Sequence, residues 1–204
     1  MPTPFWLAKE PLVLASRSSI RQKLLAAAGV PVEARPADLD ERGLEARAKP
    51  QSADAVAAFL AREKAVAVEK LHHGRLTLGA DQTLALGDQR FAKPADRDAA
   101  RAQLRALRGR SHELHSAIVF VQDGTVLFEH VAVARMIMRA CSDQFLESYL
   151  DALGEAVTAT VGVYQIEGLG VQLFERIEGD YFTVLGLPLM QALDFLRRRG
   201  SLAR

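Results

Sequence analysis

The chain has 204 residues, enough for one substantial hydrophobic core in one or two lobes. Hydrophobic residues make up 49% and charged residues 25%, which is ordinary for a soluble globular protein. The formal net charge of +1 argues against a broad nucleic-acid-binding face, because such a face needs clustered basic residues. No apolar stretch is long enough to span a bilayer, and Cys141 is the only cysteine, which excludes an intrachain disulfide. We therefore expect a cytoplasmic protein that binds neither nucleic acids nor membranes.

Strand and helix signals alternate through the first part of the chain. We predict, in order, a strand at 12–14, a helix at about 19–28, an extended segment at 32–34 and a loop opened by the acidic residues 38–41. A long helix capped by Ser52 follows, to about Leu71, with a buried stripe formed by Val56, Phe59, Leu60 and Ala67. The run 76–80 predicts a strand, which continues at 84–86 after the polar pair Asp81-Gln82 and ends in a turn at Gly87-Asp88.

The second half predicts a hairpin and three more helices. We predict, in order, a helix from Asp96 to Arg108, strands at 111–121 and 125–138, a helix from Ser142 to about 153, strands near 161–166 and 171–176, and a terminal helix with Pro188 in its first turn. Asp123-Gly124 is a strong hairpin signal between the two long strands. This order predicts one α/β domain over residues 1–204, with a mixed, twisted sheet flanked by helices and two lobes around a central cleft.

The segment after the first predicted strand has the groups of a phosphate-binding site. Ser16, Ser18 and Ser19 lie between that strand and the start of a helix, where backbone N–H groups are free. Their hydroxyls and the guanidinium of Arg21 are all groups that bind phosphate. The alternative is a serine that caps the helix and an arginine that is merely solvated.

Asp81 and Lys93 are the next candidates for chemistry. Asp81 follows the apolar run 76–80, and we expect it at a strand end, where open α/β sheets bind ligands. Lys93 comes twelve positions later, past a predicted short hairpin that could turn its ammonium toward the same volume. The alternatives are an aspartate that forms a turn and a surface lysine before a proline.

The acidic residues at 38–41 are the remaining candidates for chemistry. Asp38, Asp40 and Glu41, together with Asp81, could hold Mg²⁺, which binds one or two carboxylates, water and phosphate oxygens. The alternatives are a solvated loop or a cluster that starts a helix. The chain contains no P-loop, no dinucleotide-binding glycine motif in the required context and no GxSxG. Because these motifs are absent, metal-assisted phosphate chemistry is the interpretation that best fits the charged residues.

Five ordered blocks, at 14–25, 38–41, 79–83, 92–94 and 177–188, resemble the Maf family of nucleoside triphosphate pyrophosphatases. The segments 61–65 and 164–168 are also similar to the family. The resemblance implies an α/β domain with a cleft, usually in a homodimer, and a divalent metal, Mg²⁺ or Mn²⁺. It implies hydrolysis of a nucleoside triphosphate between the α and β phosphates, which yields a monophosphate and pyrophosphate.

The resemblance also implies roles for individual residues. Asp81 matches the catalytic aspartate that acts as general base, and Glu41 and Lys93 match the family's other catalytic residues. Glu41 and Asp81 would hold the metal, while Ser16, Arg21 and Lys93 would bind the phosphates.

Three positions linked to nucleobase choice, held here by Ile20, Gln82 and Glu167, differ from the family members that prefer dTTP and UTP. Gln82 and Glu167 resemble the branch that hydrolyses 7-methyl-GTP, although that branch has a tryptophan where this chain has Ile20. A glutamate carboxylate accepts hydrogen bonds from the N1–H and 2-amino group of guanine. We therefore expect a pyrophosphatase for modified or non-canonical nucleotides such as 7-methyl-GTP. A dTTP/UTP-type pyrophosphatase, a phosphosugar phosphatase and a non-catalytic nucleotide-binding regulator of cell division are the alternatives.

Overall fold

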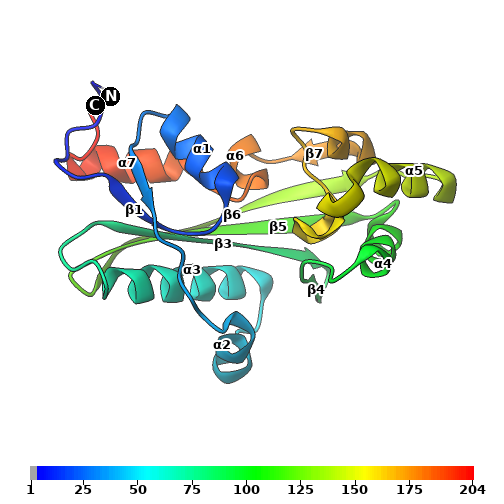
Figure 1. The fold of residues 1–204 in the computed structure, drawn as a ribbon, viewed down its shortest axis with the longest axis horizontal. Helices are drawn as coiled ribbons and strands as arrows, with labels where there is room; N and C mark the ends of the chain where they lie inside the picture. The colour runs from blue at the N-terminus through cyan, green and yellow to red at the C-terminus, as the bar shows by residue number, and fades with distance from the viewer. Residues whose placement is uncertain (1–3) are drawn as a thin grey trace. The chain divides into compact units, whose positions relative to one another are not determined.

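The computed structural model describes residues 4–204, which form two compact units. The first comprises the chain up to Gln82 together with residues 116–132 and 180–204, and the second comprises residues 83–115 and 133–179. Three long strands contribute residues to both units (Figure 1). They are β3 (Thr77–Leu86), β5 (Ser111–Gln122) and β6 (Thr125–Met138). Within residues 4–204, no helix combines the length and apolar character that crossing a membrane requires.

The remaining elements belong to one unit or the other. Those of the first unit are β1 (Leu12–Ala15), α1 (Ser19–Ala27), β2 (Val32–Ala34), α2 (Glu41–Ala48), α3 (Ala53–Glu69), α6 (Tyr181–Val184) and α7 (Leu189–Arg199). Those of the second are β4 (Gln89–Phe91), α4 (Arg97–Leu107), α5 (Asp143–Leu153), β7 (Phe174–Glu178) and the 3₁₀ turns η1 (Gly154–Thr158), η2 (Val161–Val163) and η3 (Leu169–Leu173).

Capping side chains set several helix starts. The side chains of Ser18, Asp96 and Ser142 each accept a hydrogen bond from a backbone N–H in the first turn of the helix that follows. Ser52 also stands at a helix start, at α3, but its side chain makes no such bond. The predicted positions of α1, α3, α4, α5 and α7 are thus confirmed to within about two residues.

The seven-stranded sheet is mixed, as predicted. Its order is β2-β1-β3-β5-β6-β7, with β4 paired to β3. Strands β2, β1 and β3 pair in parallel, whereas β3–β4 and β6–β7 are antiparallel. Asp123 and Gly124 have φ of 52° and 71°, which suits the two-residue turn between β5 and β6. The α/β fold class with a mixed sheet and flanking helices is therefore confirmed.

In the first unit, helices cover both faces of the sheet, with α1 and α7 on one face and α3 on the other (Figure 1). Alternate residues of a strand point to opposite faces. Leu78 and Ala80 of β3 and Phe120 of β5 pack in the cluster that includes α1 and α7. The intervening Val119 packs on the alanines of α3. This alternation decides where each polar side chain of β3 points.

Helix α3 lies unusually close to the sheet. Its inner stripe consists of small residues, Ala57, Ala61 and Ala65, all fully buried. A Cβ added to Gly79 of β3 would lie 2.0 Å from the Ala61 carbonyl oxygen, so only glycine permits this approach.

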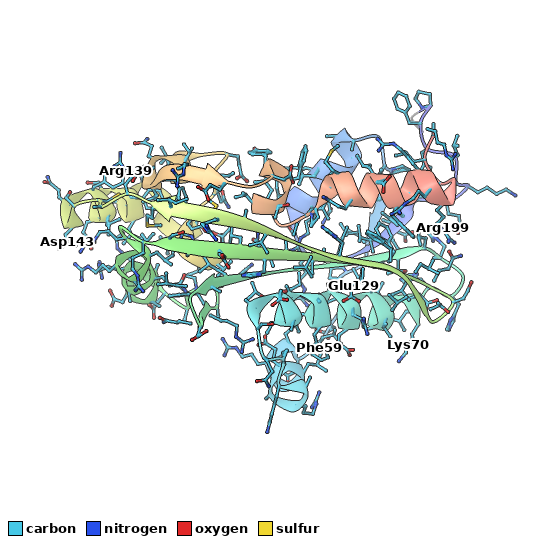
Figure 2. The ribbon with its side chains drawn as sticks, turned by 180° about the vertical axis from the view of Figure 1, so that it is seen from behind. Phe59, Lys70, Glu129, Arg139, Asp143 and Arg199 are labelled. Atoms are coloured by element: carbon cyan, nitrogen blue, oxygen red, sulfur yellow. The ribbon has the colours of Figure 1, made fainter. Side chains whose placement is uncertain are left out.

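The buried stripe predicted for α3 is correct at Val56 and Leu60 and wrong at Phe59 and Ala67, which are half-buried. At the surface, Arg62 of α3 forms an ion pair with Glu129 of β6, which is labelled in Figure 2.

Three sequence predictions are wrong. Asp81 does not end a strand, because β3 runs without a break from Thr77 to Leu86. Residues 38–41 do not only open a loop, because the side chain of Asp40 accepts from the Gly43 N–H and starts helix α2. The strands predicted near 161–166 and 171–176 are mostly 3₁₀ turns, and only Phe174–Glu178 is extended. Gly162 and Val163 have φ of 77° and 65°, which lies outside the extended region of a regular β-strand.

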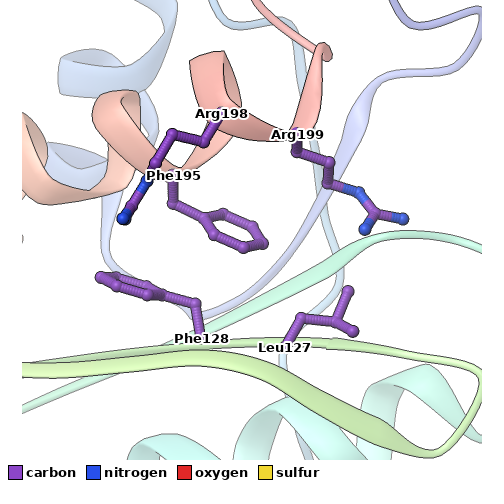
Figure 3. A pocket seen from close by; sticks show the side chains of 5 residues that line it. All are labelled: Leu127, Phe128, Phe195, Arg198 and Arg199. Atoms are coloured by element: carbon purple, nitrogen blue, oxygen red, sulfur yellow. The ribbon is translucent and has the colours of Figure 1, made fainter.

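A pocket of about 390 Å³ lies in the first unit, between β6 and the end of α7 (Figure 3). Its lining consists of Leu127, Phe128, Phe195, Arg198 and Arg199. The Phe128 and Phe195 rings stack with centroids 5.1 Å apart, and the Arg198 guanidinium lies over Phe128. None of the predicted site residues lines this pocket.

Candidate functional site

One lysine contacts two of the predicted acidic residues. The Lys64 ammonium lies 2.6 Å from Asp81 Oδ1 and 2.9 Å from Glu41 Oε1. Asp81 has the same parity in β3 as Gly79, so its side chain emerges on the α3 face, where Lys64 stands. Glu41 reaches the same ammonium from the first residue of α2. The structure therefore brings Glu41 and Asp81 together, as expected for residues that act in one site.

Burial dominates the electrostatics of Asp81. Its side chain is 11% exposed, and loss of water raises the pKa of its carboxyl group above the usual value. The nearby charges of Lys64 and Arg21, and the Lys64 hydrogen bond, oppose this rise, whereas Glu41 adds to it. A carboxylate whose pKa is raised binds a proton more readily, which suits a general base.

Arg21 is a buried clamp rather than a solvated arginine. Its Nε donates to the Gly186 carbonyl oxygen at 2.7 Å, and its Nη1 donates to Ser16 Oγ at 3.0 Å and to the Ala80 carbonyl oxygen at 2.8 Å. Burial lowers the pKa of Arg21, but a guanidinium stays protonated in proteins. The Arg21 guanidinium thus connects, through hydrogen bonds, three segments that are distant in sequence and contain Ser16, Ala80 and Gly186. Of the five guanidinium N–H groups, those of Nη2 are not used by these bonds.

Gln82 has the opposite parity to Asp81 and points to the other face of β3. Its Nε2 lies 3.0 Å from Ser116 Oγ, 3.2 Å from the Thr183 carbonyl oxygen and 3.1 Å from the Val184 carbonyl oxygen. Consecutive residues of one strand therefore serve two different clusters, one on each face of the sheet. Ile20, next to Arg21 in α1, is half-buried.

The other predicted site residues lie in the second unit. Lys93 is an exposed residue two positions after β4 ends. Glu167 is exposed in the turn between η2 and η3. The structure thus groups Ser16, Ile20, Arg21, Glu41, Asp81 and Gln82 in one unit and places Lys93 and Glu167 in the other.

Two of the predicted carboxylates do not join the cluster. Asp38 is fully exposed and faces the exposed Arg17 at 3.6 Å. Asp40 Oδ1 accepts from the Gly43 N–H and caps α2. Of the three acidic residues at 38–41, only Glu41 contributes a carboxylate to the Lys64 cluster.

Lys64 is the functional candidate that the sequence prediction omits. The segment 61–65 carries part of the family resemblance, but a lysine on a long helix has the pattern of an ordinary surface residue. One signal was available: Lys64 lies between Ala61 and Ala65, which are buried, so its side chain starts at the edge of the buried face.

The carboxylates of Glu41 and Asp81 suit a divalent cation as part of a larger ligand set. Both already face one cationic group, the Lys64 ammonium, so their position favours positive charge. Within residues 4–204, no group of three or more His, Cys, Asp or Glu side chains is placed to hold a metal ion. Mg²⁺ needs only one or two carboxylates when water and phosphate oxygens complete its shell, so the two residues fit.

Comparison with known families shows the family to which this chain belongs. The family model described as Maf-like protein matches residues 11–199. The chain belongs to the Maf-like protein family. The match covers every segment that forms the Asp81, Arg21 and Gln82 clusters.

Similar proteins of this Maf-like family have named activities. A protein of Rhodopseudomonas palustris named nucleoside triphosphate pyrophosphatase is 56% identical over 198 residues, 97% of this chain and 98% of that protein. A protein of Mesorhizobium japonicum named 7-methyl-GTP pyrophosphatase is 51% identical over 195 residues, 95% of this chain and 98% of that protein. Among solved structures, a HAM1 protein from Coxiella burnetii has a TM-score of 0.40 and 17% identity, over 64% of this chain and 74% of that chain.

Proposed function

We propose that this Maf-like protein is a nucleoside triphosphate pyrophosphatase, a hydrolase that cuts the α–β phosphoric anhydride and releases a nucleoside monophosphate and pyrophosphate. The observation that carries the proposal is the buried Asp81 carboxylate, which shares the Lys64 ammonium with Glu41. The names of the relatives at 51–56% identity support the same activity. Hydrolysis needs a general base and nucleotide binding alone does not, so Asp81 as the base favours the enzyme over the nucleotide-binding regulator.

Asp81 is the proposed general base. It accepts the proton of the water that attacks the α-phosphorus, in line with the departing pyrophosphate. Lys64 holds the Asp81 side chain in place and keeps a compensating charge beside it. Arg21, which Ser16 helps to hold, and Lys93 neutralise charge that develops on the phosphates.

Glu41 and Asp81 are the proposed ligands of a divalent cation, Mg²⁺ or Mn²⁺. When bound, such a cation neutralises phosphate oxygens and polarises the phosphoryl group. The two carboxylates would meet it from α2 and β3, on the face of the sheet that α3 covers.

The proposed substrate is a modified or non-canonical nucleotide, and 7-methyl-GTP is the first candidate. Support comes from the Mesorhizobium japonicum relative named for that activity and from Gln82 and Glu167. The Glu167 carboxylate can only accept hydrogen bonds and so complements the donor edge of guanine. The Rhodopseudomonas palustris relative carries the broader name, which keeps a dTTP/UTP-type activity as the second candidate.

We also propose a cytoplasmic homodimer. The family resemblance supports the dimer, and the free thiol of the buried Cys141 agrees with a reducing compartment.

Product analysis tests the function. The purified protein is incubated with a panel of canonical and methylated nucleoside triphosphates in the presence of Mg²⁺ or Mn²⁺. We expect equal amounts of pyrophosphate and monophosphate, highest with 7-methyl-GTP. Release of orthophosphate alone would indicate a phosphatase instead. Binding of the triphosphates without any release would favour the nucleotide-binding regulator.

A further inference from the structure

The Lys64 ammonium is the counter-ion of two carboxylates at once. It lies 2.6 Å from Asp81 Oδ1 and 2.9 Å from Glu41 Oε1, and the Lys64 side chain is only 13% exposed. Arg21 does not share this task through its Nε and Nη1, because they donate to Ser16 and to two carbonyl oxygens. A positive charge that belongs to the chain itself is therefore in direct contact with both proposed metal ligands.

The two contacts of Lys64 differ in their access to water. The Asp81 side chain is 11% exposed, whereas the Glu41 side chain, at the first residue of α2, is 45% exposed. An ion pair that is open to water contributes little stability, so the Glu41 contact is the one that breaks at little cost. A cation from solution can therefore approach the cluster from the side of Glu41.

A lysine is suited to give up such contacts. Its ammonium is a compact charge on a flexible stem, whereas the planar guanidinium of Arg21 is fixed by several hydrogen bonds. Mg²⁺ and Mn²⁺ bind carboxylate oxygens, the same groups that contact Lys64. Two cations on one partly buried pair of carboxylates repel each other, because the protein screens charge less than bulk water does. The ammonium and a divalent cation therefore compete for Glu41 and Asp81.

We propose that Lys64 is an internal counter-cation that a divalent metal ion replaces. The ammonium neutralises Glu41 and Asp81 in the free protein and moves aside within the site when the metal ion takes the two carboxylates. The inference rests on the metal site of the proposed function. Competition with Lys64 weakens binding of the metal ion alone. The released ammonium is then a donor for phosphate oxygens, so the metal ion and the triphosphate should each strengthen binding of the other.

The affinity for Mn²⁺ measures the competition. Mn²⁺ is titrated into the substrate-free protein, and electron paramagnetic resonance gives the concentration of free ion and hence the Kd. Lys64→Met should bind Mn²⁺ roughly 10- to 100-fold more tightly than the wild type, a typical range for coupling between two ligands. Arg62→Met is the matched control. Arg62 lies on the same helix but pairs with Glu129 of β6, so its removal should change the Kd by less than about twofold.

Nuclear magnetic resonance follows the lysine itself and separates replacement from simple charge repulsion. In a protein with isotope-labelled lysine, the Cε signal of Lys64 is the one that is lost in Lys64→Gln. Saturation with Mg²⁺, which is diamagnetic, should move this signal toward the position of an exposed lysine such as Lys70. A signal that does not move at saturating Mg²⁺ would overturn the inference, since the ammonium would then remain on both carboxylates.

The other outcomes of the Mn²⁺ titration are also decisive. Equal or weaker binding in Lys64→Met overturns the inference. Glu41→Gln then shows whether the metal site fails as well, because weaker binding in this variant supports the site and unchanged binding excludes it. If Lys64→Met does not fold, Lys64→Gln keeps a neutral donor at the position and gives the same comparison. Absence of Mn²⁺ binding in the wild type and in both Lys64 variants overturns the metal site of the proposed function together with the inference.

Discussion

Lys64 of α3 and Asp81 of β3 form an ion pair of 2.6 Å in which both side chains are almost buried, at 13% and 11% exposure. Buried pairs contribute little net stability, but removal of one partner leaves the other charge without compensation. This asymmetry makes the pair testable by mutation, because the cost of breaking it depends on which charge remains.

We expect Lys64→Met to lower the free energy of unfolding by about 3 kcal/mol at pH 7, because Asp81 is then buried without its cation. Asp81→Asn in the same protein should restore part of that loss, since the uncompensated charge is gone. Chemical denaturation of the two single variants and the double variant measures the coupling. Lys70→Met, at an exposed position just after α3, is the matched control and should change little.

Asp81→Asn should reduce kcat for pyrophosphate release by about 10²–10⁴, the range for loss of a general base. The fold should be retained, because the amide keeps the shape of the carboxyl group. Asp38→Asn is the matched control, since the exposed Asp38 lies outside the Lys64 cluster and should leave the rate unchanged. Wild-type turnover in Asp81→Asn would exclude the proposed role.

Gly186→Ala tests the Arg21 clamp. Gly186 has φ of 86°, and a Cβ there would lie 3.3 Å from Arg21 Nη2. The backbone strain alone should cost about 1 kcal/mol of stability. Gly200→Ala is the matched control, because its φ is 80° and no atom lies within 4 Å of the added Cβ. We expect a similar loss of stability in both variants, but a loss of kcat/KM only in Gly186→Ala, where the guanidinium is displaced.

The strand that carries the site shows what the sequence can predict. Apolar runs on both sides of Asp81-Gln82 correctly indicate strand β3, because they are buried in the sheet. The polar pair looks like a break, since sequence alone does not reveal that one residue pairs with Lys64 on α3 and the other with Ser116 on β5. Such partners are 17 and 34 positions away, and no local periodicity encodes them.

The prediction of strands in the segment 161–173 is wrong for a different reason. Its valines favour extended backbone, yet Gly162 and Val163 adopt positive φ and the chain turns. Tertiary contacts override the local preference: the Tyr149 hydroxyl donates to the Val163 carbonyl oxygen, and the Gly162 N–H donates to Gln103 Oε1. The prediction that Glu167 takes part in base recognition comes from the family resemblance and does not depend on the secondary structure around it.

Glu167→Gln should lower the preference for 7-methyl-GTP over UTP by roughly 5- to 100-fold in kcat/KM, because an amide replaces one acceptor oxygen with a donor. Rates of pyrophosphate release with the two triphosphates give this ratio directly. Glu175→Gln, at an exposed position of β7, provides the matched control with the same loss of charge. A ratio that stays at the wild-type value in Glu167→Gln would remove this residue from base recognition.

Burial of His112 should make the stability of the protein depend on pH. The ring is 1% exposed, its Nε2 lies 2.7 Å from the Tyr164 hydroxyl, and its Nδ1 has no hydrogen-bond partner among residues 4–204. Burial lowers the pKa of His112 to about 4, against about 6.5 for an unfolded chain.

Between pH 6.5 and pH 4 the unfolded chain therefore binds a proton that the folded protein does not. The contribution of the neutral His112 ring to the free energy of unfolding is fully present above about pH 6.5 and is lost as the pH falls to about 4. The free energy of unfolding should decrease by up to about 3 kcal/mol over this window, as measured by chemical denaturation at a series of pH values. His112→Phe should remove this part of the pH dependence, because no proton binds at that position in either state. An identical slope in the wild type and His112→Phe would show that His112 is already charged in the folded protein or that other groups set the slope.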